Sequence, residues 1–301
     1  MKIFFDNVNL NSRSGPNSFG RKLKDSLEKM GHDIFVSLEG QESIPDIQLS
    51  FIASSIKIAP LIQRLDGIYF NVDQDFNKLN DPIKATYLIS DGVIFQSEFN
   101  KKLTTHYFES RDKSYVIRNG TDISKIMSIV PMKNNILDNF ESVWSCASSW
   151  RPHKRLSQNI QYFLDVAPDD ACLVVAGNDP DVQISHPRVF YAGGLDWETL
   201  ISLYRRSSHF IHLAWLDHCP NVVVDARAAG CHIVCSSSGG TSEISGKNST
   251  IVVEDDWDFS PVKLYSPPEM DFSNTRAGEI DNSIDITDTS KRYLDVFKDL
   301  A

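Results

Sequence analysis

The sequence predicts an α/β protein with two doubly wound parallel sheets, and three observations lead to this prediction. Short apolar segments alternate with helical patterns in the first part of the chain, as they do when helices cover both faces of a parallel sheet. The alternation starts again at Val143, after residues 123–140, which lack buried periodicity and contain Pro131. At 301 residues, the chain has room for two domains joined by such a linker.

The first domain is expected at residues 1–135, completed by a C-terminal helix at 288–301. Its strands are predicted by short apolar runs at residues 2–8, 34–38, 47–53, 61–65, 92–96 and 115–117. A helix at residues 19–30 follows from apolar positions at spacings of three and four, which are Phe19, Leu23, Leu27 and Met30.

The second domain is expected at residues 141–280. Its strands are predicted at residues 143–147, 172–176, 189–192, 211–214 and 232–235, and its helices at 156–165, 197–206 and 221–229. Residues 256–287 are rich in Asp, Ser and Pro, which is typical of an extended connection. The last helix, at residues 289–300, has one apolar stripe formed by Tyr293, Val296, Phe297 and Leu300.

Residues 212–244 contain the densest set of candidate functional groups. Asp217 lies in a polar loop, and Asp225 lies one to two turns into the following helix, which Pro220 should open. The turn Gly239-Gly240 could direct backbone N–H groups at an anion. The two carboxylates could bind sugar hydroxyls, and two solvated aspartates would fit the spacing equally well.

The loop 148–155 concentrates positive charge in an otherwise acidic half. Arg151, Lys154 and Arg155 lie between a predicted strand and a predicted helix start. Such cations at a helix N-terminus suit a diphosphate, because they remain charged when water leaves. The alternative is a solvated basic surface.

Three further polar or glycine-rich positions follow predicted strands. Gly15 follows the first strand, Asp66 the fourth, and Gly193-Gly194-Leu195 a strand of the second domain. Ligands bind beyond the carboxyl ends of strands in such sheets, although the chain has neither the dinucleotide-binding glycine fingerprint nor a P-loop. A helix entry at Gly15 and an ion pair between Arg64 and a neighbouring acid are the structural alternatives.

The central stretch resembles the C-terminal signature of the family-4, retaining glycosyltransferases of the GT-B fold, also called glycosyl transferases group 1. In that signature, an acid is followed by seven residues, a second acid and Ala, then a small residue and Gly, and finally Gly-Gly-x-x-Glu. The sequence has these at Asp217, Asp225-Ala226, Ala229-Gly230 and 239–243. Both acids are aspartates where family members usually have glutamates.

The resemblance implies a fold, an activity and a set of site residues. Two Rossmann-like domains would face each other across a cleft, with the C-terminal helix crossing back to the first. A sugar would pass with retention from a nucleotide sugar, UDP- or GDP-linked, to a hydroxyl of a glycan, a lipid or a protein-linked sugar. The acceptor would enter from the first domain.

Individual roles follow from the same resemblance. Arg151 and either Lys154 or Arg155 would bind the diphosphate, Asp225 the ribose, and Asp217 would lie near the donor sugar or phosphate. Asp66 stands near a position where relatives often have a histidine that holds the transferred sugar. The remaining donor-binding positions would be Gly15, Gly193, Gly194, Leu195, Asn221, Val222, Gly239 and Gly240.

No metal and no cofactor are expected. Asp73-Gln74-Asp75 and Asp179-Pro180-Asp181 match a DxD motif in letters only. Positive side chains and a helix dipole could stabilise the departing diphosphate instead. Other readings remain open: a catalytically degenerate nucleotide-sugar-binding protein, a nucleotide-sugar epimerase, a phosphorylase and, with least support, a dinucleotide oxidoreductase.

Composition and charge bear on partners and location. Residues 1–140 hold 17 basic and 17 acidic side chains and residues 141–301 hold 13 and 23, so the second part carries the whole net charge of −10. This argues against nucleic acid as a partner, while contact of the neutral part with a membrane surface is left open. No apolar run is long enough for a membrane helix. Five cysteines without a CxxC pair fit reduced thiols, so a cytoplasmic location is expected.

Overall fold

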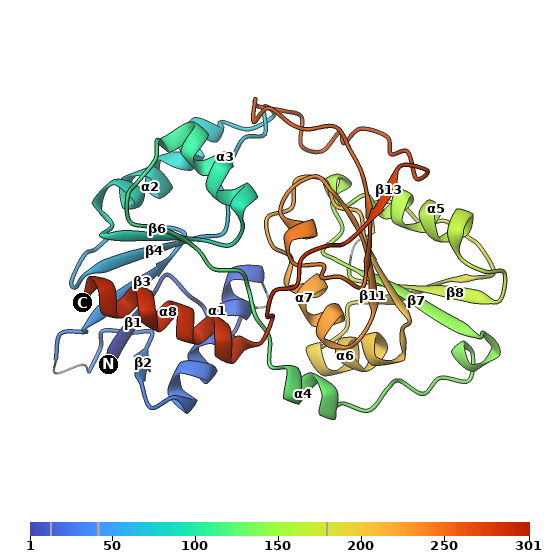
Figure 1. Cartoon of the computed structure of the whole chain (residues 1–301), viewed down its shortest axis with the longest axis horizontal. Coiled ribbons are helices and arrows are strands. Elements are labelled where there is room, and N and C mark those ends of the chain that lie inside the picture. The colour runs from blue at the N-terminus through green and yellow to red at the C-terminus, as the bar shows by residue number, and fades with distance from the viewer. Residues whose placement is uncertain (13, 41–42, 179) are drawn as a thin grey trace. The chain divides into compact units, whose positions relative to one another are not determined.

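The computed structural model describes residues 1–12, 14–40, 43–178 and 180–301, which form two compact units (Figure 1). Unit 1 comprises Met1–Asp122, Phe259–Val262 and Ser283–Ala301, and unit 2 comprises Ile123–Asp258 and Lys263–Asn282. Residues 123–135, expected in the first domain, lie in unit 2. The reason is that α4 (Ile123–Ser128) packs against α7 (Asn221–Ala228).

The sheet of unit 1 is parallel throughout. Its strand order is β2-β1-β3-β4-β5-β6. The strands are β1 (Lys2–Asp6), β2 (Asp33–Phe35), β3 (Ile47–Phe51), β4 (Leu61–Leu65), β5 (Gly92–Phe95) and β6 (Ser114–Val116). All six coincide with predicted strands, because each contains apolar residues that lie in the core or pack against it. Most of them end earlier than predicted.

Among the described residues of unit 1, four helices cover the sheet, and the last of them follows unit 2 in the sequence. They are α1 (Gly15–Lys29), α2 (Phe76–Ile89), α3 (Glu98–Phe108) and α8 (Ile286–Leu300). Helix α8 packs along α1 (Figure 1), and its Tyr293 and Phe297 are buried in the same core as Phe19 and Leu23 of α1. The predicted return of the last helix to the first domain is therefore confirmed.

Gly15 does not lie in a loop. It is the first residue of α1, which begins four residues earlier than predicted. Ser14 is the N-cap residue, and Pro16 occupies the first turn, where a missing N–H costs nothing.

The sheet of unit 2 has the order β13-β12-β11-β10-β7-β8-β9. Its strands are β7 (Ser142–Ala147), β8 (Ala171–Ala176), β9 (Val189–Gly193), β10 (His209–His212), β11 (His232–Ser236), β12 (Ser249–Val252) and β13 (Thr275–Ala277). Only β13 is antiparallel to its neighbour. Neither β12 nor β13 is predicted from the sequence, and β13 is exposed along its whole length.

The strand order of unit 2 determines where a ligand would bind. Beside α4 and α7, the unit contains α5 (Leu156–Val166) and α6 (Trp197–Arg206). Strands β7 and β10 are parallel neighbours, and the chain continues from β7 toward β8 but from β10 toward β11. The loops that follow these two strands therefore diverge, which is the arrangement that opens a binding site at the carboxyl edge of such a sheet.

All five cysteines are buried, and none of them forms a disulfide bond. Within the described part of the chain, no helix combines the length and the apolar character needed to span a membrane.

Candidate functional site

The loops that follow β7 and β10 are bonded to each other in unit 2. The backbone N–H of Trp215 donates to the carbonyl of His153 at 2.7 Å. Asn159 of α5 connects the same loops, because its Oδ1 accepts from Leu213 N at 3.1 Å and its Nδ2 donates to Lys154 O at 3.0 Å. These bonds hold together two loops that lie about sixty residues apart in the sequence.

Lys154, in the loop after β7, faces Asp217, in the loop after β10. The Lys154 Nζ lies 2.5 Å from Asp217 Oδ2, and both side chains are largely buried, at 18% and 14% exposure. His212 Nε2 lies 3.0 Å from the same oxygen, and the backbone N–H of His218 donates to Oδ1 at 2.9 Å. Burial alone would raise the pKa of Asp217, but Lys154 and His212 hold that pKa well below its usual range. Asp217 is therefore ionised.

The predicted turn Gly239-Gly240 supports the backbone of Asp217. Gly239 has φ +82°, and a Cβ there would lie 2.4 Å from the carbonyl oxygen of Asp217. The N–H of Gly240 donates to that oxygen at 2.7 Å. Only glycine combines this φ with so close an approach, so the turn fixes the loop that carries the acid.

Lys154 and Arg155, which sequence spacing could not separate, point to different places. Arg155 is in the left-handed conformation, with φ 55°. Its side chain is fully buried, and its Nη2 bonds Glu254 Oε1 at 2.7 Å and the carbonyl of Pro268 at 2.9 Å. Lys154 keeps partial access to solvent, and Arg151 is exposed at the start of the short turn Pro152–Lys154.

Asp225 is held by its neighbours in unit 2. It is the fifth residue of α7 and only 5% exposed, and its Oδ2 accepts from Trp197 Nε1 at 3.1 Å. Asn221 and Val222 begin the same helix. Pro220 is the N-cap residue rather than the first helical residue expected from the sequence.

The glycines expected near the nucleobase end the edge strand β9, on the far side of β8 from β7. Gly193 has φ +66° and its carbonyl accepts from Gly177 N at 2.7 Å. The Asn178 side chain lies against Gly194. Leu195 follows in the loop before α6.

Asp66 belongs to unit 1 and is engaged in a buried network. It forms an ion pair with Arg64, which is fully buried, and it accepts from Gln96 Nε2 at 2.8 Å. Arg64 also donates to Asn119 Oδ1 at 2.8 Å and to the hydroxyl of Tyr293 at 3.1 Å. The structural alternative for Asp66, a salt bridge with Arg64, is thus present.

The residues outside the masked positions contain no group of three or more His, Cys, Asp or Glu side chains arranged to hold a metal ion. Of the two DxD matches, Asp75 is the N-cap residue of α2, where its Oδ1 accepts from Lys78 N at 3.2 Å. Asp179, in the second match, lies outside the described residues.

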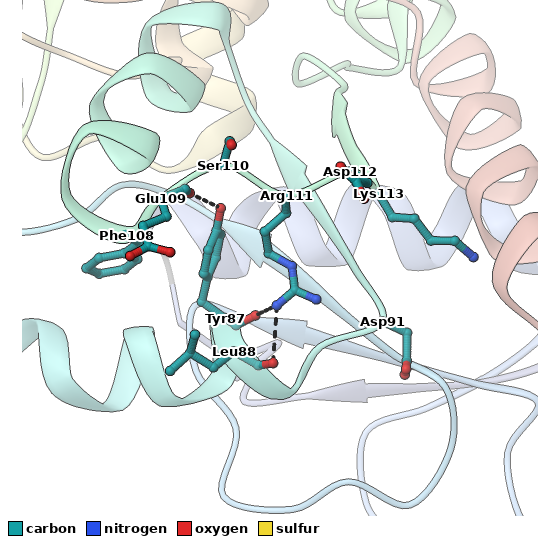
Figure 2. Close-up of a pocket in the computed structure, with 9 residues that line it drawn as sticks. All are labelled: Tyr87, Leu88, Asp91, Phe108, Glu109, Ser110, Arg111, Asp112 and Lys113. Atoms are coloured by element: carbon teal, nitrogen blue, oxygen red, sulfur yellow. Dashed lines mark hydrogen bonds between the residues drawn. The ribbon is translucent and has the colours of Figure 1, made fainter.

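A separate pocket in unit 1 contains none of the predicted site residues (Figure 2). It lies between the end of α2 and residues 108–113. Arg111 points into it but donates to the carbonyls of Tyr87, Leu88 and Ser90, at 3.2 Å for Leu88 and 2.7 Å for Ser90. Its guanidinium therefore caps the last turn of α2.

Sequence reasoning missed the partners of the candidate residues. His212, Trp197 and Glu254 contact Asp217, Asp225 and Arg155 respectively. The one available signal was His212 at the carboxyl end of a strand, a position where polar side chains face a site. Trp197 and Glu254 have no such mark, since their contacts depend on tertiary packing.

Comparisons with known proteins bear on the family and the fold. Residues 142–260 match the sequence family described as Glycosyl transferases group 1. The comparison with curated proteins gives no match. Among solved structures, HepE of Anabaena in complex with UDP and glucose has a TM-score of 0.67 at 14% identity, with 100% of both chains covered.

Two other solved structures show the same fold. The catalytic domain of starch synthase IV from Arabidopsis thaliana, bound to ADP and acarbose, has a TM-score of 0.67 at 10% identity, covering 99% of this chain and 98% of that one. Sucrose-phosphate synthase from Thermosynechococcus elongatus has a TM-score of 0.65 at 13% identity, covering 85% and 86%. The chain therefore has the GT-B fold, and residues 142–260 of its second unit match the glycosyl transferases group 1 family.

Proposed function

We propose that the chain transfers a sugar, with retention and without a bound metal, from a UDP- or GDP-linked donor to a hydroxyl of a glycan or another acceptor. The observation that carries the proposal is the pairing of Lys154 with Asp217 at the carboxyl edge of β7 and β10. The pair places a cation where the loops after β7 and β10 diverge. These strands belong to residues 142–260, which match a glycosyltransferase family.

Lys154 and Arg151 would stabilise the departing diphosphate. When the bond from the sugar to the diphosphate breaks, negative charge grows on the phosphate oxygens, and fixed positive groups lower that barrier. An ammonium has three donors. Asp217 accepts one of them, which leaves two for phosphate oxygens. Arg151 is exposed and adds a second cation, whose planar guanidinium can bind phosphate oxygens with two N–H donors.

Asp225 would bind the ribose through the carboxylate that Trp197 orients. The main chain of Gly193, Gly194 and Leu195 would contact the nucleobase. HepE is described with UDP-glucose and starch synthase IV with ADP, which supports a nucleotide as the donor's leaving group. Arg155 is buried against Glu254 and takes no part in this proposal.

The acceptor would bind to unit 1. In the same unit, Asp66 remains the proposed contact of the transferred sugar, and Gly15 remains a proposed donor-binding position. Because Asp66 already pairs with Arg64, its contribution to an acceptor or sugar would depend on that pair. The five cysteines, which are buried thiols, support a cytoplasmic location.

One observation favours a second candidate, a protein that binds a nucleotide sugar without transferring it. The carboxylate of Asp217 is occupied by Lys154, His212 and the N–H of His218. A carboxylate with three partners from its own chain has little capacity left for a donor sugar.

The experiment that tests both candidates combines binding with product analysis. Titration calorimetry with UDP, GDP, ADP and their glucose conjugates, with and without chelator, identifies the nucleotide. Mass spectrometry of mixtures with oligosaccharide acceptors then detects transfer. Lys154→Ala should abolish nucleotide binding or weaken it at least tenfold.

The matched control is Lys247→Ala. Lys247 also pairs with an aspartate of unit 2, Asp281 at 2.7 Å, but on the exposed surface, so binding should be unchanged. Nucleotide binding without any transfer would favour the second candidate. The absence of binding to every nucleotide would contradict both.

A further inference from the structure

His212 is a buried histidine that faces the candidate donor site from the end of β10. It is 4% exposed, and its Nε2 lies 3.0 Å from Asp217 Oδ2, the oxygen that also contacts Lys154. Its backbone belongs to the sheet, where Cys235 of β11 is its register partner. The backbone that carries the imidazole is therefore held in place by the sheet.

We propose that His212 is a positioning residue, which holds the carboxylate of Asp217 through Nε2–H so that Asp217 presents the Lys154 ammonium to a diphosphate. This inference rests on the proposed function and names a contact in the same site. It assigns to Asp217 the task of orienting Lys154 rather than of touching the sugar.

The protonation states of the cluster agree with this role. Burial lowers the pKa of His212, so the ring is neutral near pH 7 and can donate from one nitrogen only. Burial also lowers the pKa of His153 to about 3 and that of His218 to about 4, so neither neighbour adds a positive charge. The charges that remain are one ammonium and one carboxylate, and the imidazole is a neutral donor to the latter.

The cluster gives a physical reason for a histidine at this place. The ammonium of Lys154 lies at the end of a flexible four-carbon side chain, and holding that side chain in one conformation costs entropy. The side chain of Asp217 is short, and its Oδ2 can hold the ammonium in one position only if the carboxylate itself keeps a single rotamer. A second donor on the rigid strand β10 fixes that rotamer and leaves the ammonium in one place.

The test compares His212→Gln with His212→Leu. The amide nitrogen of glutamine can reach roughly the position of Nε2 and donate there, whereas leucine fills the space without a donor. Binding of a nucleoside diphosphate and of the matching monophosphate is measured by calorimetry, using whichever of UDP, GDP and ADP binds the unaltered chain most tightly. Circular dichroism and the melting temperature report on folding.

We expect His212→Leu to weaken diphosphate binding at least tenfold and monophosphate binding much less, with His212→Gln within about threefold of the unaltered chain. Equal losses for both nucleotides, in step with a lower Tm, would mean that His212 only stabilises the fold and would overturn the inference. Unchanged diphosphate binding in a folded His212→Leu variant would overturn it as well.

A second measurement does not depend on any nucleotide. The ¹⁵N–¹H spectrum of the histidine rings should show His212 as the neutral Nε2–H form at pH 7, assigned by its loss in His212→Gln. A charged ring or the Nδ1–H form would contradict the proposal. If the unaltered chain binds no nucleotide, the proposed function fails and the inference with it, whereas binding that His212→Leu leaves intact removes the inference alone.

Discussion

The carboxylate of Asp217, which is one methylene shorter than that of a glutamate, has partners from three neighbouring residues. A glutamate would extend one methylene farther, whereas the aspartate remains next to the backbone and accepts from Lys154, His212 and the N–H of His218. Each of these bonds favours the ionised form over the protonated one. Stability should therefore depend on the charge of this carboxyl.

The first prediction is a pH-dependent stability difference between the unaltered chain and Asp217→Asn. The pKa of Asp217 is lowered in the folded state, so its stabilising effect is fully present above the unfolded value of roughly 3.9 and is lost as pH falls through the folded pKa. We expect Asp217→Asn to be less stable by about 1–3 kcal/mol at pH 7, with the gap narrowing below about pH 4.

Urea unfolding followed by hydrogen exchange in unit 2, at pH 7, 5 and 3, measures this difference. Asp281→Asn is the matched control, because Asp281 pairs with Lys247 on the exposed surface. A gap of the same size at pH 3 and pH 7 would show that the charge of Asp217 does not stabilise the fold.

The second prediction concerns Gly239, where backbone strain and steric overlap coincide. Gly239→Ala must accept φ +82° and a Cβ 2.4 Å from the carbonyl oxygen of Asp217. Gly230→Ala is the control, since Gly230 has φ +97° with open space around it. The control should lose about 1–2 kcal/mol of stability. Gly239→Ala should lose more stability than the control, as measured by thermal melts. It should also weaken nucleotide binding, as measured by calorimetry. Equal effects of the two substitutions would contradict the close approach.

At the scale of elements, helix α8 completes the core of unit 1 although it lies at the far end of the chain. Phe297 is fully buried, and Tyr293 is both buried and bonded to Arg64 of β4. Ser290 bonds Ser26 of α1 at 2.8 Å. The sheet of unit 1 therefore depends on a helix that follows the whole of the second sheet in sequence.

The third prediction follows from this packing. Phe297→Ala should destabilise unit 1 by about 3–5 kcal/mol, the usual cost of removing a buried aromatic ring. Lys298→Ala, on the exposed face of the same helix, should cost almost nothing. Hydrogen exchange should report faster exchange in β1–β6 and unchanged exchange in β7–β12. Faster exchange in the second sheet as well would mean that the two units do not unfold separately.

The elements divide into those that the sequence predicts and those that it does not. Apolar runs such as Leu61–Leu65 and the periodic helix Trp197–Arg206 were predicted with their observed bounds, because burial dictates both residue type and spacing. Strand β13, with the sequence Thr-Arg-Ala, has no buried face and could not be recognised. Arg155 differs from Lys154 through its backbone conformation, which nearest-neighbour sequence does not reveal.

At the scale of the whole molecule, the two units have separate cores, and the proposed nucleotide site belongs to one of them. The hydrophobic clusters of the two units share no residue. Lys154, Asp217 and Asp225 all belong to unit 2. The sequence predicts this division, whereas the partners of each acid depend on which strands become neighbours.

The fourth prediction is that a nucleotide alone stabilises unit 2. A ligand at about 100 times its Kd adds about 2.7 kcal/mol to the unit that binds it. With the tightest-binding nucleoside diphosphate, amide exchange should slow in β7 and β10 and in the loops after them. Lys154→Ala should remove that protection, and Lys247→Ala should not. Protection confined to unit 1 would place the nucleotide site elsewhere.

The order in which the units can form follows from the path of the chain. The chain passes between the units after Asp122, Asp258, Val262 and Asn282. On the ribosome, the segments of unit 2 emerge before the helix Ile286–Leu300 has been translated. Domains fold as units during synthesis once their residues are available. The N-terminal sheet, although made first, must therefore wait until helix α8 has been synthesised before its core can close, while the second sheet is free to form ahead of it.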